Sequence, residues 1–238
     1  DNIGLLVGRR DKEVKSIYIA LDATDEVIDE AIRVGADMLL THHPLIFHKI
    51  NRVNTDDFIG KRIYGLIRAD MVCYAMHTNF DVIGMADAAA DKIGLVDGEV
   101  LDVTFDDGVS RQGCGRVGKL PHRMTLGECA ELVKKSFQVP SVRVYGDRDS
   151  NVRDAAVMPG SGGSFLQNAL QADADVMITG DIDHHEAIDA VAQGISIIDA
   201  GHYGIEKLFI PYMQEYLARN LQGIKLYAAP FQEPFVVV

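Results

Sequence analysis

Residues 36–44 read ADMLLTHHP, a short apolar run that ends in two adjacent histidines and a proline. The run predicts a buried strand with His42 and His43 at its carboxyl end, where open α/β sheets bind ligands. Because neutral imidazole is the commonest metal-ligating side chain, the pair indicates metal coordination. Two histidines in an exposed loop explain this motif equally well, so other parts of the chain have to decide.

The residues before this run complete a strand–helix–strand unit. Val14–Leu21 (VKSIYIAL) is apolar and predicts a strand. Thr24 or Asp25 is a plausible N-cap for a helix over Glu26–Val34, which Gly35 ends. Two strands joined by such a crossover are parallel. The predicted fold class is therefore α/β.

Similar patterns continue along the chain. Met71–Met76 predicts another buried strand, followed by the polar group HTNFD at residues 77–81. Residues 95–112 are polar and turn-rich, and we place a lobe boundary there. The predicted lobes are residues 1–105 and 106–238, with the final helix (205–220) and strand (224–228) as candidates to pack back on the first lobe.

The two halves of the chain resemble each other at an offset of 138 residues. Ile17-Tyr18-Ile19 falls on Ala155-Ala156-Val157, Asp37 on Asp175 and Thr41 on Thr179, so His42-His43 falls on Gly180-Asp181. The match is one of pattern more than of identity. It predicts two similar α/β lobes with a metal site in the cleft between them.

The segment Gly201–Glu206 (GHYGIE) follows a predicted strand and opens a helix. His202 and Glu206 are four residues apart, so on a helix they share one face, roughly 6 Å apart along the axis. An imidazole and a carboxylate in that relation can hold metal, although an ordinary polar first turn has the same appearance. Asp81 follows another strand end and could bridge two cations or simply cap a turn.

Together these strand ends offer three imidazoles and two carboxylates: His42, His43, Asp81, His202 and Glu206. That set exceeds the needs of one tetrahedral ion and suits two metal ions with open positions for water. The mixed nitrogen and oxygen donors favour Zn, Fe(II), Mn or Co over Mg.

Other polar residues are candidates for catalysis and substrate binding. His77 could be a ligand, a group behind the ligands or a proton-transfer residue. His184 and His185 diverge by about 100° on a helix, so at most one faces a cleft, and of the two we favour His184. A solvated helix face explains the pair equally well. The loop Gly160, Ser161, Gly162, Gly163 and Ser164 could bind a phosphate or carboxylate, or be a tight turn without a ligand.

The composition narrows the function classes. The net charge of -12 disfavours nucleic-acid binding, because phosphate backbones need clustered Lys and Arg. No stretch approaches ~18 consecutive apolar residues, so no membrane span is expected. The three cysteines lack CxxC spacing and predict reduced thiols in a cytoplasmic protein.

The motifs DNIGLLVG (1–8), THHP (41–44), HTNFD (77–81), GSGGS (160–164) and GHYGIE (201–206) closely resemble the Nif-three-like family, also called GTP cyclohydrolase I type 2 homologues. The resemblance spans essentially the whole chain. It implies a two-lobed α/β protein with a dinuclear metal site, assembled as a toroidal homohexamer. The family's ligands fall on His42, His43, Asp81, His202 and Glu206. The cyclohydrolase label implies hydrolytic ring opening of GTP and rests on a subset of members.

The leading functional hypothesis is a metal-dependent hydrolase that acts on a nucleotide or a phosphorylated small molecule. Two cations would activate a water that attacks an electrophilic carbon or phosphorus. His77 or His184 would transfer protons, and the Gly160–Ser164 loop would hold a substrate phosphate. The alternative is a non-catalytic metal-handling or regulatory protein, which predicts exchangeable metal and a partner protein.

Overall fold

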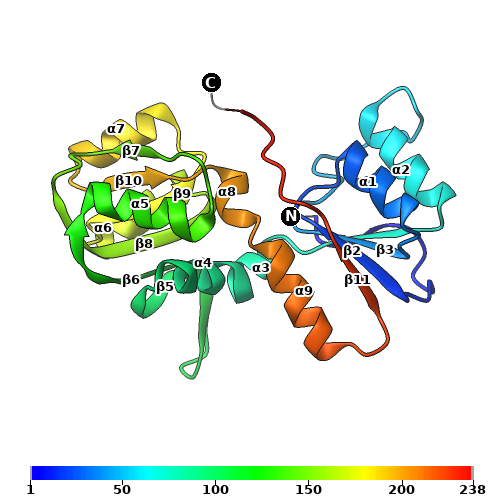
Figure 1. Cartoon of the computed structure of the whole chain (residues 1–238), viewed down its shortest axis with the longest axis horizontal. Helices are drawn as coiled ribbons and strands as arrows, with labels where there is room; N and C mark the ends of the chain where they lie inside the picture. The colour runs from blue at the N-terminus through cyan, green and yellow to red at the C-terminus, as the bar shows by residue number, and fades with distance from the viewer. Residues whose placement is uncertain (1, 237–238) are drawn as a thin grey trace. The chain divides into compact units, whose positions relative to one another are not determined.

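A computed structural model describes residues 2–236, which form two compact units, each of them a mixed α/β unit with its own sheet (Figure 1). The first unit contains the chain up to Phe80 together with Phe209–Gln232, and the second contains Asp81–Leu208 and the described residues after Gln232. The division therefore falls after residue 80 and not after residue 105. Residues 96–106 form a strand that pairs within the second sheet, which assigns them to the second unit.

The first unit has a five-stranded sheet of order β1-β4-β3-β2-β11. Its strands are β1 (Gly4–Val7), β2 (Ser16–Ala20), β3 (Met38–Thr41), β4 (Val72–Ala75) and β11 (Lys225–Ala228). Its helices are α1 (Asp25–Arg33), α2 (Phe58–Arg68), α3 (Thr78–Phe80) and α9 (Phe209–Asn220). All neighbouring strands are parallel except β1, which runs antiparallel to β4.

The predicted strand–helix–strand unit is confirmed: β2 and β3 pair in parallel, with α1 between them in sequence. Thr24 is the N-cap of α1, and its hydroxyl accepts a hydrogen bond from the Val27 N–H. The final strand β11 pairs with β2, so the C-terminal segment does return to the first unit. The central strands are apolar and buried, as Ile19 and Leu39 show, and each such side chain contributes about 1.5–3 kcal/mol of burial free energy.

The second unit has a six-stranded sheet of order β5-β6-β8-β9-β10-β7. Its strands are β5 (Val96–Asp106), β6 (Arg111–Thr125), β7 (Arg143–Tyr145), β8 (Asn151–Ser161), β9 (Val176–Gly180) and β10 (Ser196–Asp199). Its helices are α4 (Ala86–Ile93), α5 (Leu126–Phe137), α6 (Leu166–Gln171), α7 (His184–Ala192) and α8 (His202–Glu206), with the short π-helical turn η1 (Asp81–Met85) and the 3₁₀ turn η2 (Gly163–Phe165).

The internal similarity predicted from the sequence is visible in the strand registers. Ile17 pairs with Met38 in the first unit, and their counterparts Ala155 and Val176 pair in the second. A further shared device lies at the amino ends of these strands. The Asp37 carboxylate accepts hydrogen bonds from the backbone N–H groups of residues 15 and 16, and the Asp175 carboxylate accepts them from those of residues 153 and 154.

Two local predictions were wrong. Residues 95–112, expected to be turn-rich, form most of the long β5–β6 hairpin, and only residue 95 and residues 107–110 lie outside its strands. The helix expected over residues 205–220 is divided into α8 and α9. Pro211 lies in the first turn of α9, where its missing N–H and fixed φ are tolerated. In the interior of a continuous helix, the same proline would remove a hydrogen bond and clash with the preceding turn. Within residues 2–236, none of the helices is long and apolar enough to cross a membrane.

Candidate metal centre

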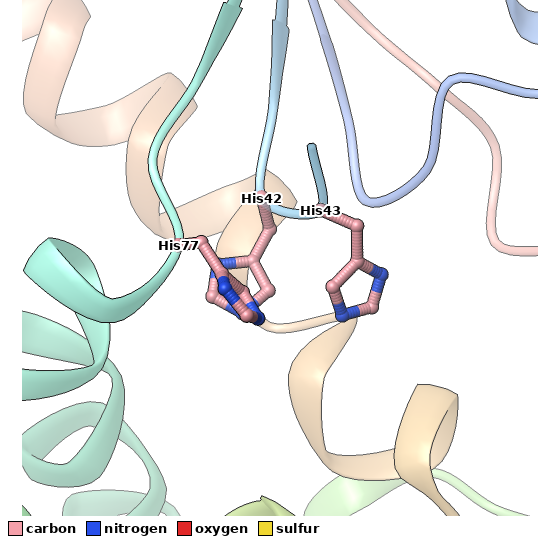
Figure 2. Close-up of side chains that lie close together, drawn as sticks. All are labelled: His42, His43 and His77. Carbon is pink, nitrogen blue, oxygen red and sulfur yellow. The ribbon is translucent and has the colours of Figure 1, made fainter. Parts of the chain in front are cut away.

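Three parallel strands of the first unit end at the same sheet edge and deliver polar side chains to it. Asp22 lies just after β2, His42 and His43 directly follow β3, and His77 lies just after β4. Carboxyl ends of parallel strands meet at one edge, which is where open α/β sheets bind ligands. Figure 2 shows the three imidazoles projecting from the ends of β3 and β4 toward the same region.

His42 is fully buried, and its ring is fixed by the backbone of the neighbouring strand end. Its Nδ1 lies 2.8 Å from the Met76 carbonyl oxygen. A carbonyl oxygen can only accept a hydrogen bond, so Nδ1 carries the proton and Nε2 carries the lone pair. Phe209 and Phe80 lie against the His42 ring, with centroid distances of 5.3 and 6.3 Å. The ring therefore lies in an apolar setting, and its neutral form has one defined tautomer.

His43 is oriented in the same way by a carboxylate. Its Nδ1 lies 2.7 Å from Oδ1 of Asp22. This contact again directs the proton to Nδ1 and leaves Nε2 as the nitrogen that can bind a metal ion. A carboxylate–histidine pair of this kind is the usual arrangement behind a metal-ligating imidazole, because it sets both the tautomer and the ring orientation. Asp22 was not among the predicted site residues, although its place after β2 puts it at the same sheet edge.

His42, His43 and His77 form a group that could hold a metal ion, each offering one ring nitrogen, and these nitrogens all lie within 4.8 Å of one another. Two ligand nitrogens of one tetrahedral zinc ion lie about 3.3 Å apart, given metal–nitrogen bonds of about 2.0–2.1 Å. The first unit thus brings His77 together with the predicted ligand pair, which sequence spacing could not show.

The second unit brings together the other predicted pair. His202 and Glu206 lie on α8, and Nε2 of His202 is 2.9 Å from Oε2 of Glu206, as the four-residue spacing predicted. The Glu206 side chain is almost fully buried, whereas the His202 side chain is 32% exposed. Nδ1 of His202 lies 3.1 Å from Oδ2 of Asp181, a carboxylate that follows β9. The pair therefore has its own orienting carboxylate, like His43.

Asp81 is the first residue of η1 and the first residue of the second unit. It is half-buried, and it lies near Cys114 on β6: burial, then the charges of Asp81 and Asp102, raise the pKa of the Cys114 thiol. π-Helical turns are rare and occur often at functional sites. The sequence predicted Asp81 in the first lobe, because it continues the polar group that follows β4.

His184 and His185 lie in the first turn of α7, where both side chains are exposed and their ring centroids are 5.2 Å apart. Among the described residues, no cluster of three possible metal ligands includes either histidine. Asp183 is the N-cap of this helix and forms a capping box with Glu186. The catalytic role of His184 stays a prediction.

The glycines of the Gly160–Ser164 loop have packing reasons of their own. A Cβ atom on Gly160 would lie 2.4 Å from Oε1 of Glu206, and one on Gly162 would lie 2.2 Å from Oγ1 of Thr179. A Cβ atom on Gly163 would lie 2.1 Å from a carboxylate oxygen of Glu186. A substrate anion at Gly163 would meet that negative charge, so the predicted phosphate role finds less support there than the tight-turn explanation.

Comparisons with known proteins agree with the motifs. The chain matches the family model described as Duf34/NIF3 (NGG1p interacting factor 3) over residues 1–233. It is 39% identical over 208 residues to the GTP cyclohydrolase 1 type 2 homolog of Clostridium perfringens, which covers 87% of this chain and 79% of that protein.

Solved structures show the same fold. The Bacillus cereus protein related to NIF3 superposes with a TM-score of 0.91 and 28% identity, covering 100% of this chain and 93% of that one. Reduced HcgD from Methanocaldococcus jannaschii gives a TM-score of 0.81 and 33% identity, covering 97% of this chain and 90% of that one. The chain belongs to the Duf34/NIF3 family, which includes the GTP cyclohydrolase 1 type 2 homologs.

Proposed function

We propose that this protein binds two divalent metal ions and is a metal-dependent hydrolase of a nucleotide or a phosphorylated small molecule. The proposed ligands are His42, His43, Asp81, His202 and Glu206, and the proposed metals are Zn, Fe, Mn or Co. The observation that carries the proposal is the fixed tautomer of His42 and His43. Both rings have Nδ1 bonded to an oxygen acceptor, which leaves Nε2 of each as the donor atom.

The donor set fits borderline divalent metals. The imidazoles of the first unit supply nitrogen, and Glu206 supplies a nearly buried carboxylate beside His202. Two bound cations of this class supply Lewis-acid activation of water and stabilise negative charge that develops on a substrate. The chain's own residues bind, orient and transfer protons: Asp22 and the Met76 carbonyl orient the first pair, and Asp181 orients His202.

His77 has two roles open to it in this scheme. Its place in the three-histidine group supports a third nitrogen ligand, and its partial burial at a strand end also suits proton transfer. A nucleotide as substrate is supported by the name of the relatives, GTP cyclohydrolase 1 type 2 homolog. We further propose, from the family resemblance, that the protein acts as a homohexamer, which its mass in solution would test.

The test is turnover by metal-loaded protein. Protein reconstituted separately with Zn, Fe(II), Mn and Co is assayed against a panel of nucleotides and phosphoesters, with His43→Ala as the variant expected to lose both metal and activity. Hydrolysis of one panel member, dependent on metal and lost in His43→Ala, would support the proposal. No turnover with any of the four metals, together with rapid metal transfer to a chelator, would favour a metal-handling protein instead.

A further inference from the structure

Asp199, the last residue of β10, carries a fully buried carboxylate that joins two turns. Its Oδ1 accepts a hydrogen bond from the Gly201 N–H at 2.8 Å, and its Oδ2 accepts one from the Ile182 N–H at 3.2 Å. The Arg143 guanidinium, on the antiparallel neighbour β7, pairs with the same Oδ2. The Asp199 side chain is 0% exposed, whereas that of Arg143 is 59% exposed, so the guanidinium closes the site from the solvent side.

The two turns that Asp199 joins carry the orienting group and the imidazole of the second unit. Ile182 directly follows Asp181, and Gly201 directly precedes His202. The side chains of Asp181 and His202 share a 3.1 Å hydrogen bond. Asp181 has φ 48°, a left-handed conformation that costs a non-glycine residue free energy and persists only where its surroundings impose it. A Cβ atom on Gly180 would lie 2.6 Å from the His202 backbone nitrogen, so the turns approach closely.

The buried carboxylate is not a general feature of the repeated fold. Thr179 pairs with Asp199 in the second sheet, and its counterpart Thr41 pairs with Ala75 in the first. At that position the first unit therefore needs no carboxylate. Burying a charge costs free energy that a small apolar residue avoids, so a need specific to the second unit has to account for Asp199. The two turns that it joins supply that need.

We propose that Asp199 is a positioning residue, which holds Asp181 and His202 in register and so sets the metal affinity of the His202–Glu206 pair. The inference rests on the proposed function, because it takes that pair as metal ligands. It adds a residue that touches neither metal nor substrate and acts through the backbone of the two turns. Loss of the carboxylate would release Gly201 or Ile182 and let the His202 ring depart from the orientation set by Asp181.

The test compares Asp199→Asn with Asp175→Asn as a matched control. Asp175 also accepts two backbone N–H hydrogen bonds, at 2.7 and 3.0 Å, but at the amino end of the same parallel strands. Two quantities are measured: Co(II) affinity, from visible absorption in a titration, and hydrogen exchange of the Ile182 and Gly201 amides in the metal-free protein. Glu206→Gln provides the reference for loss of a second-unit ligand.

We expect Asp199→Asn to weaken the Co(II) affinity that Glu206→Gln also weakens, by about 10–100-fold, and to speed exchange of at least one of the two amides, because asparagine keeps only one acceptor oxygen. Asp175→Asn should change neither quantity. Wild-type Co(II) affinity in Asp199→Asn, or an equal loss in Asp175→Asn, would overturn the inference. If the unaltered protein takes up no Co(II), the proposed function fails, but hydrogen exchange of the amides still tests the positioning role. Unchanged exchange in Asp199→Asn would overturn that role. Faster exchange in Asp199→Asn, but not in Asp175→Asn, would support it.

Discussion

Nδ1 of His43 lies 2.7 Å from Oδ1 of Asp22, so a carboxylate after β2 fixes the ring that follows β3. The two residues come from neighbouring parallel strands, and their contact depends on the register in which Ala20 pairs with Thr41. His42, one residue earlier, is fixed instead by the backbone carbonyl of Met76, directly after β4. Adjacent imidazoles thus take their orientation from strands on opposite sides of β3.

Asp22→Asn should weaken metal binding without unfolding the protein. The amide keeps the shape of the side chain but loses the charge that favours a proton on Nδ1, and such changes behind a ligand cost about 10–100-fold in metal affinity. The Asp22 side chain is 45% exposed, so stability should change little. Competition with a chromophoric zinc chelator measures the affinity. Asp29→Asn, an exposed substitution on α1 with the same charge change, should retain wild-type affinity.

His77→Asn and His184→Asn should separate the two histidines predicted to act in catalysis. His77 lies with His42 and His43 in a possible ligand group, so its loss should lower metal content or affinity. His184 is exposed on α7, and its loss should leave the metal content at the wild-type value. Elemental analysis after dialysis reports both results. Equal metal content in the two variants would show that His77 contributes no ligand.

Gly160→Ala should disrupt the position of Glu206. Gly160 has φ 69°, and a Cβ atom there would lie 2.4 Å from Oε1 of Glu206. The left-handed φ costs about 1 kcal/mol, and the overlap should add about 1–3 kcal/mol. Gly223→Ala is the control, because Gly223 has φ 74° and nothing within 4 Å of a Cβ atom. Urea unfolding should show a larger loss of the free energy of unfolding for Gly160→Ala than for Gly223→Ala. Of the two variants, Gly160→Ala alone should also lose metal affinity.

The buried thiols should make the protein less stable at alkaline pH. Burial raises the pKa of Cys73 and of Cys129 to about 12. Each thiol therefore stays protonated in the folded state while the unfolded chain loses its proton above the ordinary thiol pKa. The free energy of unfolding is therefore unaffected by these thiols below the ordinary thiol pKa. Above it, the free energy of unfolding falls by about 1.4 kcal/mol per pH unit for each thiol as pH rises toward about 12.

The comparison of Cys129→Ala with the unaltered protein isolates one of these thiols. The difference between their free energies of unfolding at pH 7 gives the packing cost of the substitution, and that difference should shrink as pH rises from 9 to 10.5. Curves that stay parallel over this range would show that Cys129 is not held neutral by burial. At pH 8, Cys73 and Cys129 should also react with a thiol reagent only after unfolding.

Local patterns in the sequence were sufficient for most elements. Helix α5 is specified by local signals, because the Thr125–Glu128 capping box and the apolar spacing of residues 126–137 act within one helix. The β5–β6 hairpin was missed because β5 is exposed along most of its length, so burial does not impose a regular alternation on its residues. The break before α9 was indicated by Pro211, which the helical spacing around it obscured.

By itself, the sequence determined which residues stand at strand ends and that two similar α/β halves exist, because strand burial and the strand–helix–strand order follow from short-range patterns. Tertiary structure decided which of those residues meet. His42 contacts Met76 across 34 residues, Asp22 contacts His43 across 21, and β11 returns from the far end of the chain to pair with β2. Such contacts depend on strand order, register and side-chain rotation, none of which is set by neighbouring residues.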